Sequence, residues 1–459
     1  MKTQIIKSEK IISGARLDCW YYLSPANSAI SSIEHAKKAG YSSINIGGPT
    51  GFAKVWKPTR SKLSYAVEGE RKIPYLRPYD VFNYFPEPAD WLSVPRTEDL
   101  EDYTLHEGTI LQTCSGRNLG PAVIVDKYLE KFVIGADMIR IFINDERLRF
   151  YLLAFLNSQS GKKILRRNKT GSVVDHLSEE DMRDHEILLL DDDAIDKIVD
   201  LMKRSITIRE NARLKLFELI KSIEGSLPKI ERCSPPKDGW IVKSDFMTGR
   251  IDAAFYDPLV DNVRQELINI GGIAVKDVAR VLKPGGRYKT RYLSKEYGVP
   301  ILSGSQLVQT YTINLRYISP AIFQDITKYQ LKAGWIAYPA DGRAEEELGT
   351  PVIITQDRDN WLASGHVGRI IPKEGINPGW LFLALKAKHA QIQLKARASG
   401  SVVDSTFEKD MEEVILPPQS SHIDWDSALY VWNNLGEAQT LEEMASAIID
   451  NTFIKFGTT

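Results

Sequence analysis

The sequence has few cysteines, no excess of either charge and no long hydrophobic run. Its three cysteines (Cys19, Cys114 and Cys233) lie far apart and form no CxxC pair. This spacing argues against a disulfide framework and a zinc site, and it favours a reducing compartment. The apolar stretches are short and interrupted by charge, so no segment is expected to cross a membrane. Because the first ten residues also lack the apolar core of a secretory signal, we expect a cytoplasmic protein.

The charge balance restricts the kinds of partner. The chain has 59 Lys and Arg against 60 Asp and Glu, a formal net charge of −1. A chain that binds nucleic acid alone is usually basic, because phosphate neutralisation supplies much of the affinity. Three alternatives follow: the chain binds something else, its basic groups are concentrated locally, or a partner supplies the positive charge. The seven histidines are scattered and form no metal-ligand spacing, so no metal site is predicted.

An internal repeat is the most informative feature of the sequence. Seven segments recur in the same order, first 234, then 226 and finally 229 positions later. The matched segments are Arg16 with Arg250, 55–58 with 281–284, 73–76 with 299–302, 105–110 with 331–336, 115–117 with 341–343, 140–141 with 369–370, and 171–175 with 400–404. Each change of distance is a small insertion of the kind that surface loops absorb. The chain is therefore interpreted as a tandem duplication within 459 residues.

Each copy is followed by a segment with a helical pattern. After the first copy, nine residues at alternating spacings of three and four form a heptad seam, weakened in the middle by Ser205 and Arg209. They are Ile195, Ile198, Met202, Ser205, Arg209, Ala212, Leu216, Leu219 and Ile223. Gly225 and Pro228 are expected to end this helix. After the second copy, a stripe over 441–449 predicts another helix, and Gly436 is expected to make it less regular or to break it in two.

The pattern inside each copy predicts a mixed architecture. Short apolar runs at 122–125, 132–143 and 351–355 predict strands, whereas 150–156 and 380–386 predict helices. The predicted fold class is α+β, with two tandem mixed α/β domains separated and followed by long helices. We expect these helices to pack antiparallel and the copies to be related by a pseudo-twofold axis.

The repeated motifs resemble those of the specificity subunits of type I restriction–modification systems over essentially the whole chain. Segment 73–81 (IPYLRPYDV) is similar to the family's "IPxLR..DI" element, and 105–120 to its "L..GDIL…SG..G" element. Segments 171–190 and 400–419 are similar to its closing "G..V..L….L..I.IPLPP..Q" element. The second copy departs from the pattern, because 302–307 (LSGSQL) replaces "LR..DI".

The resemblance implies a non-catalytic subunit that reads a bipartite site on double-stranded DNA. It implies target-recognition domains at 1–190 and 228–420, a helical spacer at 191–227 and a helical region at 421–459. The implied partners are two adenine-N6 methyltransferase subunits, which use S-adenosylmethionine, and a restriction/translocase subunit, which uses ATP and Mg²⁺. No cofactor is expected in this chain. An alternative is a specificity-like DNA-binding or scaffold subunit of another phage-defence complex.

The candidate DNA-binding residues surround the repeated Lys-Pro or lie in matched loops. In the first copy they are Lys54, Lys57, Arg60, Lys62, Arg77, Arg117 and Asn118. In the second copy they are Lys283, Arg287, Lys289, Arg291, Ser303, Gln306 and Arg343. This local concentration of positive charge reconciles DNA binding with the neutral net charge. The alternatives are a solvated basic loop and, for the polar residues, a turn-forming role.

An enzyme is the rival interpretation, and the sequence offers little for it. The chain has no NPPY-type tetrad, no Gly-rich cofactor loop and no GxxxxGK[ST] segment. The only tempting nuclease-like triplet is 70–72 (ERK), and the nearest preceding aspartate is Asp18, far upstream. We expect Asp18 and Asp252 to form structural ion pairs or caps with Arg16 and Arg250. No catalytic residue is predicted.

Overall fold

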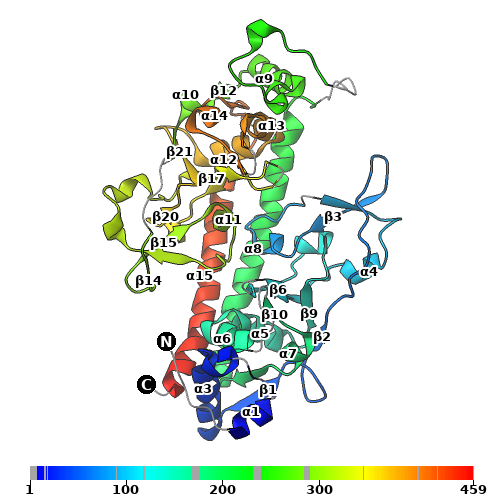
Figure 1. Cartoon of the computed structure of the whole chain (residues 1–459), viewed down its shortest axis with the longest axis vertical. Helices are drawn as coiled ribbons and strands as arrows, with labels where there is room; N and C mark the ends of the chain where they lie inside the picture. Colours follow the sequence, from blue (N-terminus) through cyan, green and yellow to red (C-terminus); the bar gives the residue numbers. More distant parts are fainter. Residues whose placement is uncertain are drawn as a thin grey trace. The chain divides into compact units, whose positions relative to one another are not determined.

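The computed structural model describes residues 8–14, 17, 19–88, 90–116, 119–167, 175–230, 239–283, 290–344, 346–400, 403–420 and 422–457. The chain forms two compact units (Figure 1). Unit 1 comprises Met1–Glu210 and Glu437–Thr459, and unit 2 comprises Asn211–Gly436. Unit 2 is therefore continuous in sequence, whereas unit 1 combines the first 210 residues with the last 23.

Unit 1 contains one four-stranded antiparallel sheet and a smaller sheet. Its elements are α1 (Ser8–Gly14), α2 (Cys19–Leu23), α3 (Ala26–Lys38), β1 (Ser42–Asn45), β2 (Lys54–Trp56), β3 (Lys72–Leu76), η1 (Asp80–Phe82), β4 (Asp90–Ser93), α4 (Leu100–Tyr103), β5 (Ile110–Thr113), β6 (Ser115–Gly116), β7 (Ala122–Ile124), β8 (Val133–Ile134), β9 (Met138–Phe142), α5 (Glu146–Asn157), α6 (Gln159–Arg167), β10 (Asp175–His176), α7 (Glu179–Arg183) and β11 (Glu186–Leu189). The large sheet has the order β2-β9-β5-β7. In the smaller sheet, β3 pairs antiparallel with β4 and parallel with β8. Two further ladders join β1 to β11 and β6 to β10.

Unit 2 repeats this arrangement. Its elements are α9 (Pro258–Asn269), β12 (Ile273–Ala274), α10 (Val275–Val278), β13 (Ala279–Leu282), β14 (Tyr292–Leu293), β15 (Val299–Leu302), α11 (Gly304–Leu307), β16 (Arg316–Ile318), β17 (Ile336–Pro339), β18 (Asp341–Gly342), β19 (Val352–Ile353), β20 (Leu362–Ala363), β21 (Val367–Pro372), α12 (Pro378–Lys386), α13 (Lys388–Arg397), β22 (Asp404–Ser405), α14 (Glu408–Glu412) and β23 (Ile415–Leu416). The large sheet has the matching order β13-β21-β17-β19, and β15 pairs antiparallel with β16 and parallel with β20. The strand order confirms the predicted duplication.

A buried arginine occupies the same position in both large sheets. Arg140 of β9 and Arg369 of β21 each donate from Nη1 to a main-chain carbonyl, that of Thr104 at 2.9 Å and that of Gln330 at 3.2 Å. Burial lowers the pKa of both guanidinium groups to about 10. The two acceptors are also repeat-related, so the duplication extends to individual hydrogen bonds.

The element that departs from the family pattern in the second copy has the same local structure as its counterpart. In η1, the carboxylate of Asp80 accepts a hydrogen bond from the backbone N–H of Arg77 at 2.8 Å. At the start of α11, the amide oxygen of Gln306 accepts from the backbone N–H of Ser303 at 3.0 Å. Arg77 and Ser303 are 226 positions apart, and so are Asp80 and Gln306. A glutamine therefore replaces an aspartate as the acceptor, and the turn is retained.

Two long helices follow the repeats and run antiparallel, as expected. They are α8 (Asp192–Ser226) and α15 (Trp425–Phe456), and α8 is about 52 Å long at ~1.5 Å per residue. All nine residues of the predicted seam in α8 are buried. The first part of α8 and the last part of α15 belong to unit 1, and the remaining parts belong to unit 2.

The prediction that Gly436 makes the second helix irregular or breaks it is wrong, because α15 is continuous across this residue. A Cβ at Gly436 would lie 2.6 Å from Oδ1 of Asp357 and 3.1 Å from Cβ of Thr355. The glycine therefore lets the helix pack closely against the turn at 355–357 of unit 2. Its role is close packing rather than helix termination.

The two polar positions of the seam belong to a buried network in unit 1. The hydroxyl of Ser205 donates to the main-chain carbonyl of Ala438 at 2.8 Å and to Oε1 of Glu442 at 3.0 Å. Nη1 of Arg209 donates to the same Oε1 at 2.5 Å. Arg209 and Glu442 are each 4% exposed at the side chain. A buried ion pair of this kind is strongly destabilising to break, and we expect it to help fix the register of the helix pair.

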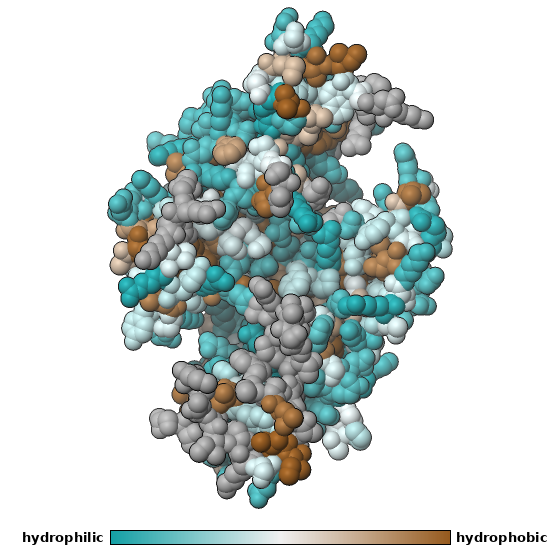
Figure 2. Space-filling view, in the orientation of Figure 1, coloured by the Kyte–Doolittle hydropathy of each residue, from teal (hydrophilic) through white to brown (hydrophobic). Residues whose placement is uncertain are grey.

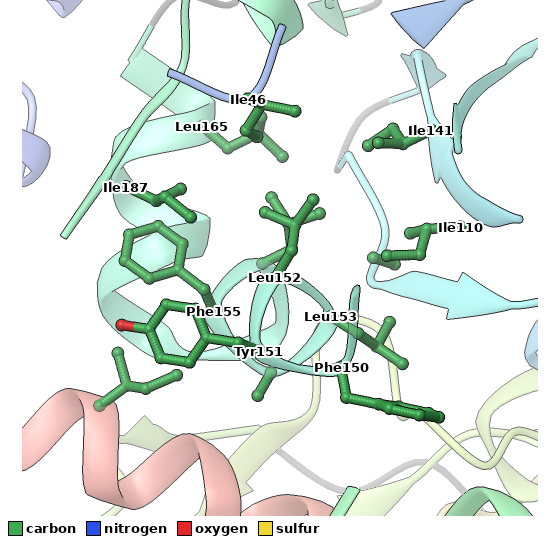
Figure 3. Close-up of a cluster of buried hydrophobic side chains, with 14 of the residues drawn as sticks. Ile46, Ile110, Ile141, Phe150, Tyr151, Leu152, Leu153, Phe155, Leu165 and Ile187 are labelled. Carbon is green, nitrogen blue, oxygen red and sulfur yellow. The ribbon is translucent and has the colours of Figure 1, made fainter. Parts of the chain in front are cut away.

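The core of unit 1 surrounds α5 (Figure 3). Every residue from 150 to 156 is buried, so this helix has no solvent-facing side along that stretch. Phe155 lies near Ile187 of β11. In unit 2, residues 379–385 of α12 are buried in the same way.

The strand predicted at 132–143 is divided, which corrects the sequence interpretation. Its first part, β8, pairs with β3 in the smaller sheet, and its second part, β9, joins the large sheet. The chain crosses from one sheet to the other at residues 135–137, and a single apolar run therefore serves two sheets. Asp137 and its repeat-related residue His366 lie at this crossing.

Candidate nucleic-acid interface

In unit 2, four side chains meet just after the end of strand β13, where Lys283 follows Leu282. Nζ of Lys283 donates to Oδ1 of Asp341 at 2.7 Å and to the main-chain carbonyl of Thr406 at 2.9 Å. Nδ1 of His366 lies 2.5 Å from Oδ2 of the same carboxylate. Although burial opposes ionisation, hydrogen bonds from Lys283, Ser405 and His366 hold the pKa of Asp341 below its usual value. We call these residues (Lys283, Asp341, His366 and Ser405) the second edge.

The second edge joins two of the repeated motifs. Asp341 lies on β18 and pairs with Ser405 of β22, so segments 341–343 and 400–404 meet in one ladder. The main-chain carbonyl of His366 accepts from the N–H of Ala340 at 2.9 Å. Asp341 and Lys283 are 16% and 13% exposed at the side chain, whereas His366 is 72% exposed. The Nδ1 side of the imidazole thus contacts an ionised carboxylate, and most of the ring is exposed to solvent.

The corresponding place in unit 1 has different side chains on the same backbone. Nη2 of Arg60 donates to Oδ1 of Asp137 at 2.7 Å, which raises the pKa of the guanidinium, and Arg60 is 72% exposed. Ser115 of β6 and His176 of β10 lie 3.1 Å apart at Oγ and Nδ1. The N–H of Cys114 donates to the carbonyl of Asp137 at 3.3 Å, matching the bond between Ala340 and His366. We call Arg60, Ser115, Asp137 and His176 the first edge.

The remaining basic candidates of the first copy are solvent-accessible. Lys54 and Lys62 are exposed, Lys57 is half-buried, and Nζ of Lys54 lies 5.3 Å from the ring centroid of Trp56. Arg77 is 48% exposed and pairs with Asp90 at 3.2 Å. Arg117 and Asn118 lie outside the described residues.

The candidates of the second copy differ from one another in their surroundings, because some are exposed and others form local hydrogen bonds. Arg291 is exposed, and Arg343 is 72% exposed beside Glu346 at 3.8 Å. Ser303 and Gln306 form a capping box at α11, and Nε2 of Gln306 also donates to the carbonyl of Ile313 at 2.7 Å. The turn-forming alternative therefore describes their observed contacts. Arg287 and Lys289 lie outside the described residues.

Sequence reasoning missed Asp137, Asp341 and His366 as members of these edges. The candidates are basic residues near the repeated Lys-Pro and polar residues in matched loops. Two of the missed residues are acidic, and the third is a histidine far from the Lys-Pro in sequence. The repeat does align Asp137 with His366, which are 229 positions apart, and so it identifies a position at which the two copies differ in charge. The expected ion pair between Arg250 and Asp252 is present at 2.6 Å, whereas Arg16 and Asp18 lie outside the described residues.

The described surface is mainly polar in the view of Figure 2, with hydrophobic side chains in small groups. No helix in the described part of the chain combines the length and apolar character that a membrane span needs. Within the same ranges, no group of three or more His, Cys, Asp or Glu side chains is placed to hold a metal ion.

No family model matches the sequence, and no curated protein matches it. Among solved structures, the S subunit of a type I restriction–modification system from M. genitalium matches with a TM-score of 0.30 and 13% identity, over 91% of this chain and 99% of that one. The HsdS subunit from Thermoanaerobacter tengcongensis matches with a TM-score of 0.26 and 12% identity, over 89% and 99% of the two chains. The chain is similar to type I S subunits over most of its length. A third match, from a study of type I system assembly and conformational transition, has a TM-score of 0.28 and 13% identity, over 88% and 98%.

Proposed function

We propose that this chain is a non-catalytic recognition subunit that binds a bipartite site on double-stranded DNA. In this proposal it acts in the cytoplasm and holds two adenine-N6 methyltransferase subunits on the site, with a restriction/translocase subunit joining for cleavage. S-adenosylmethionine and ATP with Mg²⁺ are used by those partners. The observation that carries the proposal is the duplication of one structural edge, with matched backbone and different exposed side chains.

The physical argument begins with the matched backbone. The same short ladder and the same pairing of an edge strand with the strand after the crossing recur in both units. A duplicated module offers one surface to each of two half-sites, as a dimer does. Because the side chains differ between the edges, the two half-sites need not have the same sequence.

Local charge supports DNA as the ligand. Lys54 and Lys62 are exposed in the first copy, and such groups neutralise phosphates regardless of the net charge of the chain. The guanidinium of Arg60 uses one donor on Asp137 in the described contacts, and a guanidinium has five. The remaining donors suit the O6 and N7 acceptors of a guanine edge.

Mapping N6-methyladenine across the source genome, with and without the gene, tests the proposal. We expect methylation to disappear at one bipartite motif in the deletion strain and to return when the wild-type gene is restored. Unchanged methylation would contradict the methyltransferase role and favour a subunit of another defence complex.

A binding measurement separates DNA recognition from a scaffold role. The Lys54→Ala/Lys62→Ala variant of the full chain should bind duplex DNA more weakly and with a shallower salt dependence. Each lost phosphate contact should reduce the slope of log K against log salt by about 0.9. A scaffold would keep its partners and show the same DNA affinity as the wild type.

A further inference from the structure

The two edges differ most at the residue where the chain crosses between sheets. This position is Asp137 in the first copy and His366 in the second, 229 residues later. In the first edge the aspartate accepts from Arg60, and in the second edge the histidine binds Asp341. Each edge thus pairs a carboxylate with one highly exposed nitrogen-bearing side chain, but the carboxylates stand at different repeat positions, because Asp137 corresponds to His366 and Asp341 corresponds to Ser115.

We propose that His366, oriented by Asp341, reads a base in the second half-site through Nε2, and that Arg60, oriented by Asp137, reads a base in the first. The inference rests on the proposed DNA-binding function and assigns the residues that make the two half-sites different. His366 is a specificity-determining residue in this scheme, and the two aspartates are positioning residues.

The chemistry of the imidazole follows from its hydrogen bond. Because a carboxylate only accepts, Nδ1 of His366 carries the proton, and Nε2 is the atom left for a ligand. In the neutral ring, Nε2 accepts from an exocyclic amine of adenine or cytosine. In the protonated ring, it donates to N7 or O6 of a purine. Either contact identifies a base edge in the major groove.

The carboxylates favour base readout over phosphate contact at these positions. Asp341 is ionised and lies directly beneath the imidazole, and Asp137 lies beside the guanidinium. Each carboxylate offsets positive charge beside it, so a phosphate at the same place is attracted less strongly than it is by an unpaired lysine or arginine. The carboxylates therefore align the two side chains without adding attraction for the DNA backbone. Lys283 has a different role, since it is largely buried and donates to Asp341 and to the main-chain carbonyl of Thr406.

Methylome mapping in the deletion strain tests this assignment with the chain in its own complex. The strain is complemented with the wild type, His366→Ala, His366→Gln, Arg60→Ala or His422→Ala. His422 is also an exposed histidine of unit 2 but lies outside the second edge, so its variant is the matched control. We expect His366→Ala to relax one base pair of one half-site, with about tenfold less discrimination there, as for the loss of one hydrogen bond to a base.

The expected pattern has three further parts. Arg60→Ala should relax one base pair in the other half-site. His366→Gln should affect the base preference only at the position that His366→Ala relaxes, where it retains or changes the preferred base. His422→Ala should keep the wild-type motif. An unchanged motif in His366→Ala would overturn the assignment. Uniform or complete loss of methylation in both His366 variants would also overturn it, as would relaxation of the same half-site by Arg60→Ala. If the wild-type gene restores no methylated motif, the proposed function fails instead.

Discussion

His185 offers a direct test of how burial controls the stability of unit 1. It precedes β11 and is 4% exposed, its ring lies 6.2 Å from that of Phe155, and its Nε2 has no hydrogen-bond partner among the residues that the structure describes. Burial lowers its pKa to about 4. The repeat-related residue in unit 2 is Val414, which is also buried. The duplication therefore supplies a natural replacement, His185→Val.

The direction of the pH dependence of stability follows from the protonation state of His185 in the folded and the unfolded chain. Between pH 6.5 and about 4, the unfolded chain binds a proton at His185 that the folded chain excludes. The stability associated with the neutral ring is therefore fully present above pH 6.5 and is lost as the pH falls. With these pKa values, the free energy of unfolding should decrease by about 2 kcal/mol from this group between pH 8 and pH 5.

We expect His185→Val to remove this loss while changing stability at pH 8 by no more than about 1 kcal/mol, because the smaller side chain also removes an unpaired polar atom. Urea unfolding at pH 8 and pH 5 measures both quantities, with pulse labelling of Cys114, which is buried in unit 1, to follow that unit. His106→Val, at an exposed histidine, is the matched control. Equal losses of stability between pH 8 and pH 5 in the wild type and His185→Val would refute the reasoning.

Two further predictions concern the long helices. Glu442→Gln should lower the free energy of unfolding in urea by about 3–5 kcal/mol, because it removes the negative charge that Arg209 contacts in its buried ion pair. Arg209→Met with Glu442→Leu should recover most of this loss, and an unaltered single variant would show that the pair does not hold the helices. Gly436→Ala should destabilise unit 2 by about 1–3 kcal/mol, since its Cβ would meet Asp357. Gly225→Ala, with no atom within 4 Å of the new Cβ, should instead stabilise by about 0.5–1 kcal/mol, and equal shifts in melting temperature would contradict the packing argument.

The duplication and the helices were predictable from sequence alone. The repeat depends only on the order and spacing of residues, and the structure confirms it in strand order and in the bonds of Arg140 and Arg369. The seam of α8 was predictable because helical periodicity is local. The replacement of Asp80 by Gln306 looked like the loss of a motif, since a sequence does not show that both side chains accept from the same backbone position.

The candidate site was predictable only in part. Local composition selected Arg60 and Lys283, but not the carboxylates that hold them, because Asp137 and Asp341 are brought to them by strands distant in sequence. The buried partner of Arg209 and the close approach that explains Gly436 also depend on residues far along the chain. The sequence by itself determined that one module occurs twice and ends in a long helix, because order and periodicity are properties of the chain. Only the tertiary structure decided which charges are neutralised and which remain exposed, because those properties depend on contacts across the fold.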